Sequence, residues 1–276
     1  MTASFQPRGE RGSSWQNTTV ADAMSESDVE LAVRLAGMAG QRLLDLRLGE
    51  GAAGDELRAL GDAASQAMLA EILVKERPAD AVLSEEAADD LRRLDDDRVW
   101  IIDPLDGTRE FAEGRSDWAV HVALWRRDDD LIGAISLPAD RIVLASEPAP
   151  VMLERRPGPL RLAVSRTRPP QIALDVAGEL GFDLVPMGSA GYKIAAVLRG
   201  EVDAYVHSGG QYQWDSAAPV AVAVAAGAHA SRLDGLPLRY NDVDVYLPDL
   251  VVCRPSLAGQ LLDVLARLAS TVEVTE

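Results

Sequence analysis

Apolar side chains recur at helical spacing near the start of the chain. One such stretch follows Ser27, which stands three residues before Glu30 in the pattern of a capping box, so a helix is predicted to begin there. Its apolar positions are Leu31, Leu35, Met38 and Leu43. A second helix is predicted from Asp62 onward, with apolar positions at Met68, Leu69, Ile72 and Leu73. Between the two helices, three glycines within residues 49–54 favour a mobile loop.

Short apolar runs bounded by Gly, Pro or charged residues predict a series of strands in the middle of the chain. These runs occupy residues 81–83, 99–102, 118–125, 131–137, 141–145 and 160–164. The second run stops at Asp103-Pro104, so a buried strand is expected to carry Asp103 at its own end.

After Pro169 the pattern changes to an alternation of helices and strands. Strands are predicted at 183–185 and 204–207, and helices at 192–198 and 215–226. The charged, proline-rich segment 155–159 separates this part from the strand-rich middle. We therefore predict an α/β protein of two closely packed lobes. They are an N-terminal α+β lobe at 27–156 and a C-terminal α/β lobe at 157–276, after a disordered tail at 1–26.

Composition excludes some classes of protein. The 276 residues contain no apolar run long enough to cross a bilayer, which predicts no membrane partner. With 27 basic against 44 acidic residues, a net charge of −17 argues against binding to a nucleic-acid polymer. The single cysteine, Cys253, and the absence of a secretory signal pattern predict a cytoplasmic protein.

Acidic residues also gather where chemistry is expected. Residues 103–108, Asp-Pro-Leu-Asp-Gly-Thr, place two carboxylates and a hydroxyl in one turn after a buried strand. Magnesium prefers such oxygen ligands, and two carboxylates could bridge a pair of these ions. Gly107 lets the backbone approach a phosphate closely. The plain alternative for this segment alone is an Asp-Gly turn with a solvated acidic rim.

Two more carboxylates stand at the ends of predicted elements. Glu85 follows a short strand, and Asp215 opens an alanine-rich helix, where a carboxylate would be its N-cap. Each alone is better explained as ordinary structure. Together with residues 103–108 they favour a metal site over ordinary structure.

With these motifs the chain resembles the inositol monophosphatase superfamily over residues 28–270. The resemblance rests on residues 83–86, 100–108 and Trp214-Asp215. It implies a layered α/β/α/β/α fold and the hydrolysis of a phosphate monoester by metal-activated water. It also implies two Mg²⁺ ions with the presence of a third left open, inhibition by lithium, and a homodimer. The metal ligands that it implies are Glu85, Asp103, the carbonyl of Leu105, Asp106 and Asp215. The catalytic residues that it implies are Asp62, Thr108 and Glu85, the first two of which orient the attacking water.

Two segments of the second lobe, 164–168 and 188–193, look more like the 3′(2′),5′-bisphosphate nucleotidase branch of that superfamily. That branch implies a small phosphorylated metabolite as partner, 3′-phosphoadenosine 5′-phosphate or its sulfated analogue, and a role in sulfate assimilation. The substrate-binding residues expected on this basis are Glu85, Leu105, Asp106, Gly107, Thr108, Ser165, Arg166, Gly188, Ser189, Lys193 and Asp215.

Of these residues, Arg166 and Lys193 are expected to bind a phosphate that is not hydrolysed, and the alternative for each is an ordinary surface position. Residues 205–210 lack the acid that inositol phosphatases present there, which makes inositol less favoured. Inositol phosphate and fructose bisphosphate remain alternative substrates. A non-catalytic regulatory relative is a further hypothesis.

Other phosphatase chemistries fit less well. A haloacid-dehalogenase-type enzyme would have one residue between its two aspartates, whereas Pro104 and Leu105 both separate them here. Cys253 lies in an apolar, strand-like run and is expected to belong to the core. The three histidines show no ligand spacing, and a structural role is expected for His121, His207 and His229.

Overall fold

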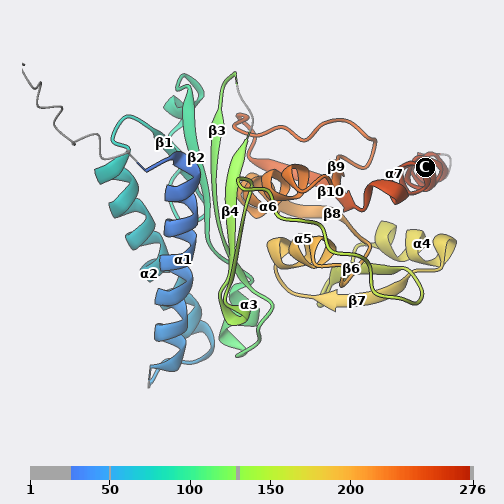
Figure 1. The fold of residues 1–276 in the computed structure, drawn as a ribbon, viewed down its shortest axis with the longest axis horizontal. Coiled ribbons are helices and arrows are strands. Elements are labelled where there is room, and N and C mark those ends of the chain that lie inside the picture. The colour runs from blue at the N-terminus through green and yellow to red at the C-terminus, as the bar shows by residue number, and fades with distance from the viewer. Residues whose placement is uncertain (1–25, 50, 129–130, 274–276) are drawn as a thin grey trace, which may run out of the picture.

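Helices and sheets alternate in five layers (Figure 1). The computed structural model describes residues 26–49, 51–128 and 131–273, so the predicted tail lies outside the described residues except for Glu26. Helices α1 (Asp28–Leu48) and α2 (Gly54–Glu76) form the outer layer beside the first sheet. Helices α5 (Ala190–Leu198) and α6 (Gln213–Ala225) lie between the two sheets, and α4 (Gln171–Leu180) and α7 (Ala258–Glu273) cover the far side of the second. The predicted α/β/α/β/α architecture is confirmed.

The first helix begins as its capping box predicts. Ser27 Oγ accepts from the N–H of Glu30 at 3.2 Å, and the Glu30 carboxylate accepts from the N–H of Ser27 at 2.8 Å. The second helix begins at Gly54, so the predicted start at Asp62 is wrong. Leu57 and Gly61 already belong to its buried face, but the alanines and charged residues around them weaken the apolar pattern.

The first sheet has the strand order β1-β2-β3-β4-β5, with β1 parallel to β2 and the other neighbours antiparallel. Its strands are β1 (Ala81–Ser84), β2 (Arg98–Asp106), β3 (Ala119–Arg126), β4 (Ile132–Leu137) and β5 (Ile142–Ala145). Short helical segments occupy Leu91–Leu94, Thr108–Ala112 (α3) and Pro138–Asp140.

Strand β2 does not stop at Asp103-Pro104, contrary to the prediction. It continues to Asp106, and its register against β3 shifts between Asp103 and Asp106. Pro104 has no N–H to give to a neighbouring strand, so a bulge here lets the strand continue. Both aspartates therefore lie within one strand.

The second sheet has the order β7-β6-β8-β10-β9, with β6 parallel to β7 and β8, and β10 antiparallel to β8 and β9. Its strands are β6 (Arg161–Ser165), β7 (Asp183–Met187), β8 (Ala204–Tyr212), β9 (His229–Ser231) and β10 (Tyr246–Cys253). A short helical turn at Pro255–Leu257 precedes α7, a helix that the sequence reasoning missed. Cys253 is buried, as expected for a core residue.

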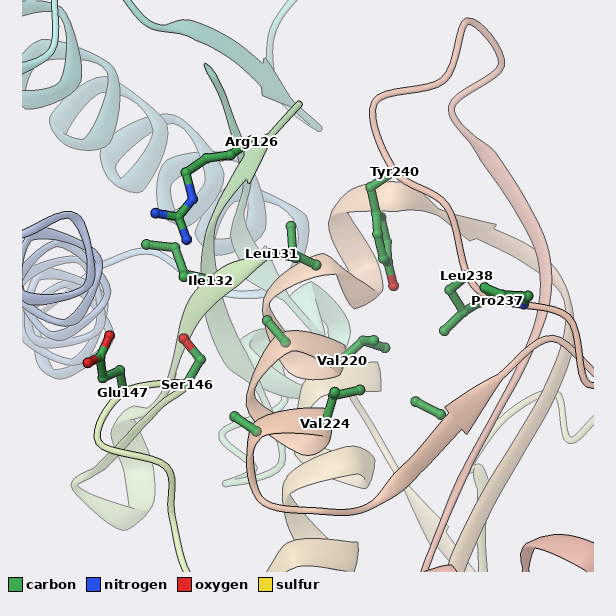
Figure 2. A pocket seen from close by; sticks show the side chains of 13 residues that line it. Arg126, Leu131, Ile132, Ser146, Glu147, Val220, Val224, Pro237, Leu238 and Tyr240 are labelled. Carbon is green, nitrogen blue, oxygen red and sulfur yellow. The ribbon is translucent and has the colours of Figure 1, made fainter. Parts of the chain in front are cut away.

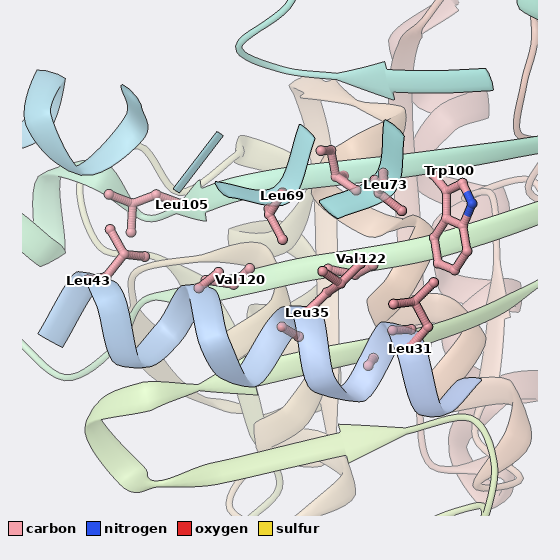
Figure 3. Packing of buried hydrophobic residues seen from close by; sticks show 14 of the residues in the cluster. Leu31, Leu35, Leu43, Leu69, Leu73, Trp100, Leu105, Val120 and Val122 are labelled. Carbon is pink, nitrogen blue, oxygen red and sulfur yellow. The ribbon is translucent and has the colours of Figure 1, made fainter. Parts of the chain in front are cut away.

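Apolar side chains of α1 and α2 pack on the outer face of the first sheet (Figure 3). The buried residues include Leu31, Leu35, Leu43, Leu69, Leu73, Trp100, Leu105, Val120 and Val122. Each fully buried leucine contributes roughly 2 kcal/mol relative to an exposed one. Because the side chain of Leu105 is packed in this core, it holds the backbone between Asp103 and Asp106 in place.

Helix α6 follows a strand of the second sheet in sequence but also packs on the inner face of the first. Its contact with β4 is very close, since a Cβ placed on Gly133 would lie 2.8 Å from the Cα of Ala218. Only glycine permits that approach. None of the described helices is both long and apolar enough to cross a bilayer.

Candidate metal centre

Four carboxylates come together where β1, β2 and α6 meet. Asp103 and Asp106 lie on β2, Glu85 directly follows β1, and Asp215 lies in the first turn of α6. Because β1 runs parallel to β2, Glu85 reaches the end of the strand pair that carries the aspartates, and its N–H donates to the carbonyl of Ile102 at 3.4 Å. The fold thus unites the carboxylates that the sequence had placed on separate elements.

Burial and mutual repulsion disfavour four negative charges at this place. Burial first, and then repulsion from Glu85 and Asp106, raise the pKa of Asp103 well above its ordinary value. The pKa of Asp215 is raised in the same way by burial and by Asp106. Desolvation of its carboxylate raises the pKa of Glu85 to about 7, although its interaction with Asp103 works in the opposite direction. Such a cluster requires bound protons or a cation to neutralise it.

The oxygen atoms in this cluster fit a divalent cation. Asp103 Oδ1 accepts from the N–H of Leu105 at 3.0 Å, whereas its Oδ2 is buried and has no hydrogen-bond partner among the described residues. Ligand atoms of Asp103, Asp106 and His121 all lie within 4.8 Å of one another. Carboxylates and carbonyls are the ligands that magnesium prefers, so the four carboxylates of the cluster suit Mg²⁺.

Asp215 is not the N-cap of the helix, which was the alternative to a metal ligand for this residue taken alone. The N-cap is Tyr212, and Asp215 stands three residues later, where its Oδ2 accepts from the N–H of Tyr212 at 2.6 Å. This bond fixes the carboxylate at the start of α6 without using both of its oxygens. Asp215 therefore keeps an oxygen for the cluster.

Asp62 and Thr108 border the cluster from the side of α2 and α3. Burial, and then repulsion from Glu86, raise the pKa of Asp62 to about 7. Thr108 is the first residue of α3 and follows Gly107, whose φ of 89° is a left-handed conformation that favours glycine. Ser65 on α2 donates to the carbonyl of Pro104 at 2.7 Å, which ties this helix to β2.

A cavity of about 260 Å³ opens beside Thr108. Seven predicted substrate-binding residues line it, namely Gly107, Thr108, Ser165, Arg166, Gly188, Ser189 and Lys193. The lining also contains residues that the sequence reasoning missed, namely Arg58, Arg109, Glu110, Thr167, Arg168 and Met187. Five of the lining side chains are basic, in a chain whose net charge is −17, so this cavity is suited to an anion.

The two basic residues that the sequence singled out are already engaged. Arg166 donates to Glu110 at 2.9 Å and to Glu113 at 2.7 Å. Lys193 is buried, donates to the carbonyl of Gly188 at 3.1 Å, and lies 5.1 Å from the ring centre of Tyr205. Burial lowers the pKa of Lys193.

Two other arginines of the lining, Arg109 and Arg168, are exposed, and neither forms an ion pair with an acid within the part of the chain that the structure describes. Arg109 was detectable in principle, because it directly follows Thr108. Arg168 lies inside the 164–168 motif, but the motif gave no reason to prefer it to Arg166.

His121, for which the sequence predicted a structural role, lies beside the carboxylate cluster. It lies on β3, with its Nε2 3.3 Å from Asp106 Oδ2. The available signal was a polar residue in the middle of an otherwise apolar strand.

A larger cavity of about 660 Å³ lies elsewhere, between β4, α6 and the segment 237–240 (Figure 2). Its lining is mostly apolar, with Ile132, Val220 and Leu238 among its residues. The smaller cavity is the one that adjoins the carboxylate cluster, because its lining includes Gly107, which follows Asp106, and Ser189, whose Oγ donates to Asp106 Oδ2.

The sequence pattern of the inositol monophosphatase family matches residues 21–271. The chain belongs to this family. A relative from Mycobacterium leprae, named 3′-phosphoadenosine 5′-phosphate phosphatase, is 51% identical over 255 residues, which cover 87% of this chain and 93% of that protein. A relative of the same name from Mycobacterium tuberculosis is 54% identical over 220 residues, 75% of this chain and 80% of that protein.

Solved structures agree with this assignment. CysQ from Bacteroides thetaiotaomicron, described as a bacterial member of the inositol monophosphatase family, matches with a TM-score of 0.69 and 25% identity. The match covers 83% of this chain and 97% of that one. Mycobacterium tuberculosis SuhB shares the fold with a TM-score of 0.66.

Proposed function

We propose that this chain is a Mg²⁺-dependent phosphatase that removes the 3′-phosphate of 3′-phosphoadenosine 5′-phosphate, or of its sulfated analogue, to give the 5′-nucleotide and phosphate. The observation that carries the proposal is the cluster of four carboxylates, of which Asp103 and Asp106 are buried, beside a basic cavity. The names of relatives that are 51% and 54% identical support the choice of substrate.

We infer that Glu85, Asp103, Asp106, Asp215 and the carbonyl of Leu105 would hold two Mg²⁺ ions, while a third ion is left open. When bound, Mg²⁺ offsets charge on the phosphate oxygens and acidifies a water molecule. Asp62, whose pKa is raised to about 7, is suited to accept a proton from that water near neutral pH. The Thr108 hydroxyl would fix the orientation of the water together with Asp62.

The substrate would place its two phosphates in different surroundings. The 3′-phosphate would lie against Gly107 and Thr108, next to the carboxylates. The second phosphate would enter the basic cavity, where Arg109 and Arg168 have no acid to neutralise them among the described residues. Inositol 1-phosphate has a single phosphate and would leave these arginines uncompensated, so it is the less favoured substrate.

The test is phosphate release in the presence of Mg²⁺ from 3′-phosphoadenosine 5′-phosphate, inositol 1-phosphate, fructose 1,6-bisphosphate and adenosine 5′-phosphate. We expect strong preference for the first compound, and no release from it in the presence of a chelator. Preference for inositol 1-phosphate would contradict the substrate, and no release from any compound would contradict the enzymatic function.

Further expectations follow from the same proposal. Lithium should inhibit the reaction, and light scattering should show a homodimer. A role in sulfate assimilation in the cytoplasm predicts that loss of the protein alters growth on sulfate but not on cysteine. The division into lobes at 27–156 and 157–276 predicts that a protease cuts first within 155–159.

A further inference from the structure

The ring of His121 lies among three elements that build the candidate metal centre. It is fully buried on β3, and its strand partner across the sheet is Asp103. Its Nδ1 lies 3.1 Å from the carbonyl oxygen of Trp214, the residue that precedes Asp215. A carbonyl oxygen can only accept, so Nδ1 carries the hydrogen and donates it. The ring thus connects the first sheet to the start of α6.

The other side of the ring faces Asp106. His121 Nε2 is 3.3 Å from Asp106 Oδ2 and has no hydrogen-bond partner among the described residues. A histidine buried for packing alone would have its ring nitrogens satisfied or turned to apolar neighbours. Here one nitrogen tethers α6 and the other lies against a carboxylate of the cluster.

Helix α5 also depends on this ring. A Cβ on Gly191 would stand 2.0 Å from His121 Nε2, so the helix packs directly on the imidazole. From that position the N–H of Gly191 donates to Asp106 Oδ2 at 2.9 Å. The ring therefore determines how closely α5 approaches Asp106.

We propose that His121 is a positioning residue that, by its bond to the Trp214 carbonyl, holds Asp215 at the correct place opposite Asp103 and Asp106, and thereby sets the affinity for the divalent cation. This inference rests on the metal site of the proposed function. It concerns the placement of the ligands, not a contact between His121 and substrate.

The experiment measures Mn²⁺ binding without substrate, from the paramagnetic resonance signal of the free ion. The variants are His121→Ala, His121→Asn and His121→Gln. The Asn amide nitrogen can take the place of Nδ1 and restore the donor to Trp214, whereas the Gln amide reaches toward the place of Nε2. The control is His229→Ala, because His229 on β9 bonds only Ser231 Oγ, at 2.9 Å, among its side-chain contacts in the described structure.

We expect His121→Ala to weaken Mn²⁺ binding by about tenfold or more, the usual effect of losing a residue that orients a metal ligand. His121→Asn should recover most of the affinity, whereas His121→Gln should bind Mn²⁺ as weakly as His121→Ala. His229→Ala should bind Mn²⁺ as the wild type does. If His121→Ala does not fold, the comparison of Asn with Gln decides.

Wild-type affinity in His121→Ala would overturn the proposal, and so would recovery by Gln but not by Asn, or an equal loss in His229→Ala. These results would leave the proposed function intact. Absence of Mn²⁺ binding by the wild-type protein would instead contradict the metal site itself.

Discussion

Ser189 donates a hydrogen bond of 2.6 Å from its Oγ to Oδ2 of Asp106, across 83 positions of sequence. The same hydroxyl accepts from the N–H of Tyr192 at 2.9 Å and caps α5. One side chain therefore fixes both the start of a helix and a carboxylate of the candidate metal centre.

Replacing Ser189 with alanine should lower both stability and metal affinity. A hydrogen bond to a charged group is worth about 1.5–3 kcal/mol, and the buried Asp106 oxygen would keep only the bond from Gly191. Urea unfolding and the Mg²⁺ concentration for half-maximal activity measure the two effects. Ser189→Gly is the matched variant, because Ser189 has a φ of 46° that glycine adopts without strain. It should be more stable than Ser189→Ala but equally impaired in its Mg²⁺ response; an unchanged response in both would refute the role of the hydroxyl.

Asp103→Asn should reduce turnover by more than about 100-fold, beyond the usual loss for a residue that only orients a metal ligand. In the absence of metal the same variant should unfold at a higher temperature than the wild type, because it removes a carboxylate whose charged form is disfavoured by burial and by repulsion. Asp249→Asn is the control, for which the opposite change in unfolding temperature is expected. Asp249 accepts from Arg232 and from the N–H of Leu233, so its loss should lower the unfolding temperature. A lower unfolding temperature for Asp103→Asn would contradict the account of the cluster.

The metal-free protein should lose stability as the pH rises through the pKa of Asp62. This pKa is raised from 3.8 to about 7 in the folded state, so the folded state holds the proton more tightly than the unfolded state. The contribution to stability is complete below 3.8 and disappears as the pH rises through about 7. Asp62→Asn lacks this contribution and should show a weaker fall in unfolding free energy over that range, measured in a chelator. Parallel pH curves for variant and wild type would show that Asp62 does not titrate as described.

Arg109→Ala and Arg168→Ala should each raise KM for 3′-phosphoadenosine 5′-phosphate by about tenfold or more, since each removes a charge-assisted bond to the second phosphate. Adenosine 3′-phosphate, which lacks that phosphate, should be hydrolysed as before. Arg166→Ala should have a smaller effect, because Glu110 and Glu113 already neutralise Arg166. Arg92→Ala, which removes an exposed arginine paired with Asp90, is the control. Equal losses for both substrates would exclude Arg109 and Arg168 from a subsite for the second phosphate.

The sequence was sufficient where the signal is local. The capping box at Ser27 and the strand that ends before Glu85 depend on neighbours in the chain, and both were predicted correctly. The carboxylates of residues 103–108 were recognisable because they follow one another closely, although the bulge that keeps them in one strand was not foreseen.

Contacts between distant segments were beyond the sequence. Nothing near Arg166 in the sequence reveals that Glu110 and Glu113, on and next to α3, neutralise it, and the prediction named Arg166 without considering Arg168. His121 acquires its surroundings only when α5 and α6 pack against β3. The spacing of residues along the chain indicates neither the ion pairs of Arg166 nor the surroundings of His121.

Helix α6 packs closely on β4 at Gly133 and Ala218, and this contact limits where the chain can be cut into two fragments. A fragment that ends at residue 156 would lack Asp215 and would expose the sheet face that α6 covers. The two halves would therefore be expected to aggregate when made separately, and to regain a complete centre only when made together, because the later half supplies both the missing ligand and the cover for the earlier one.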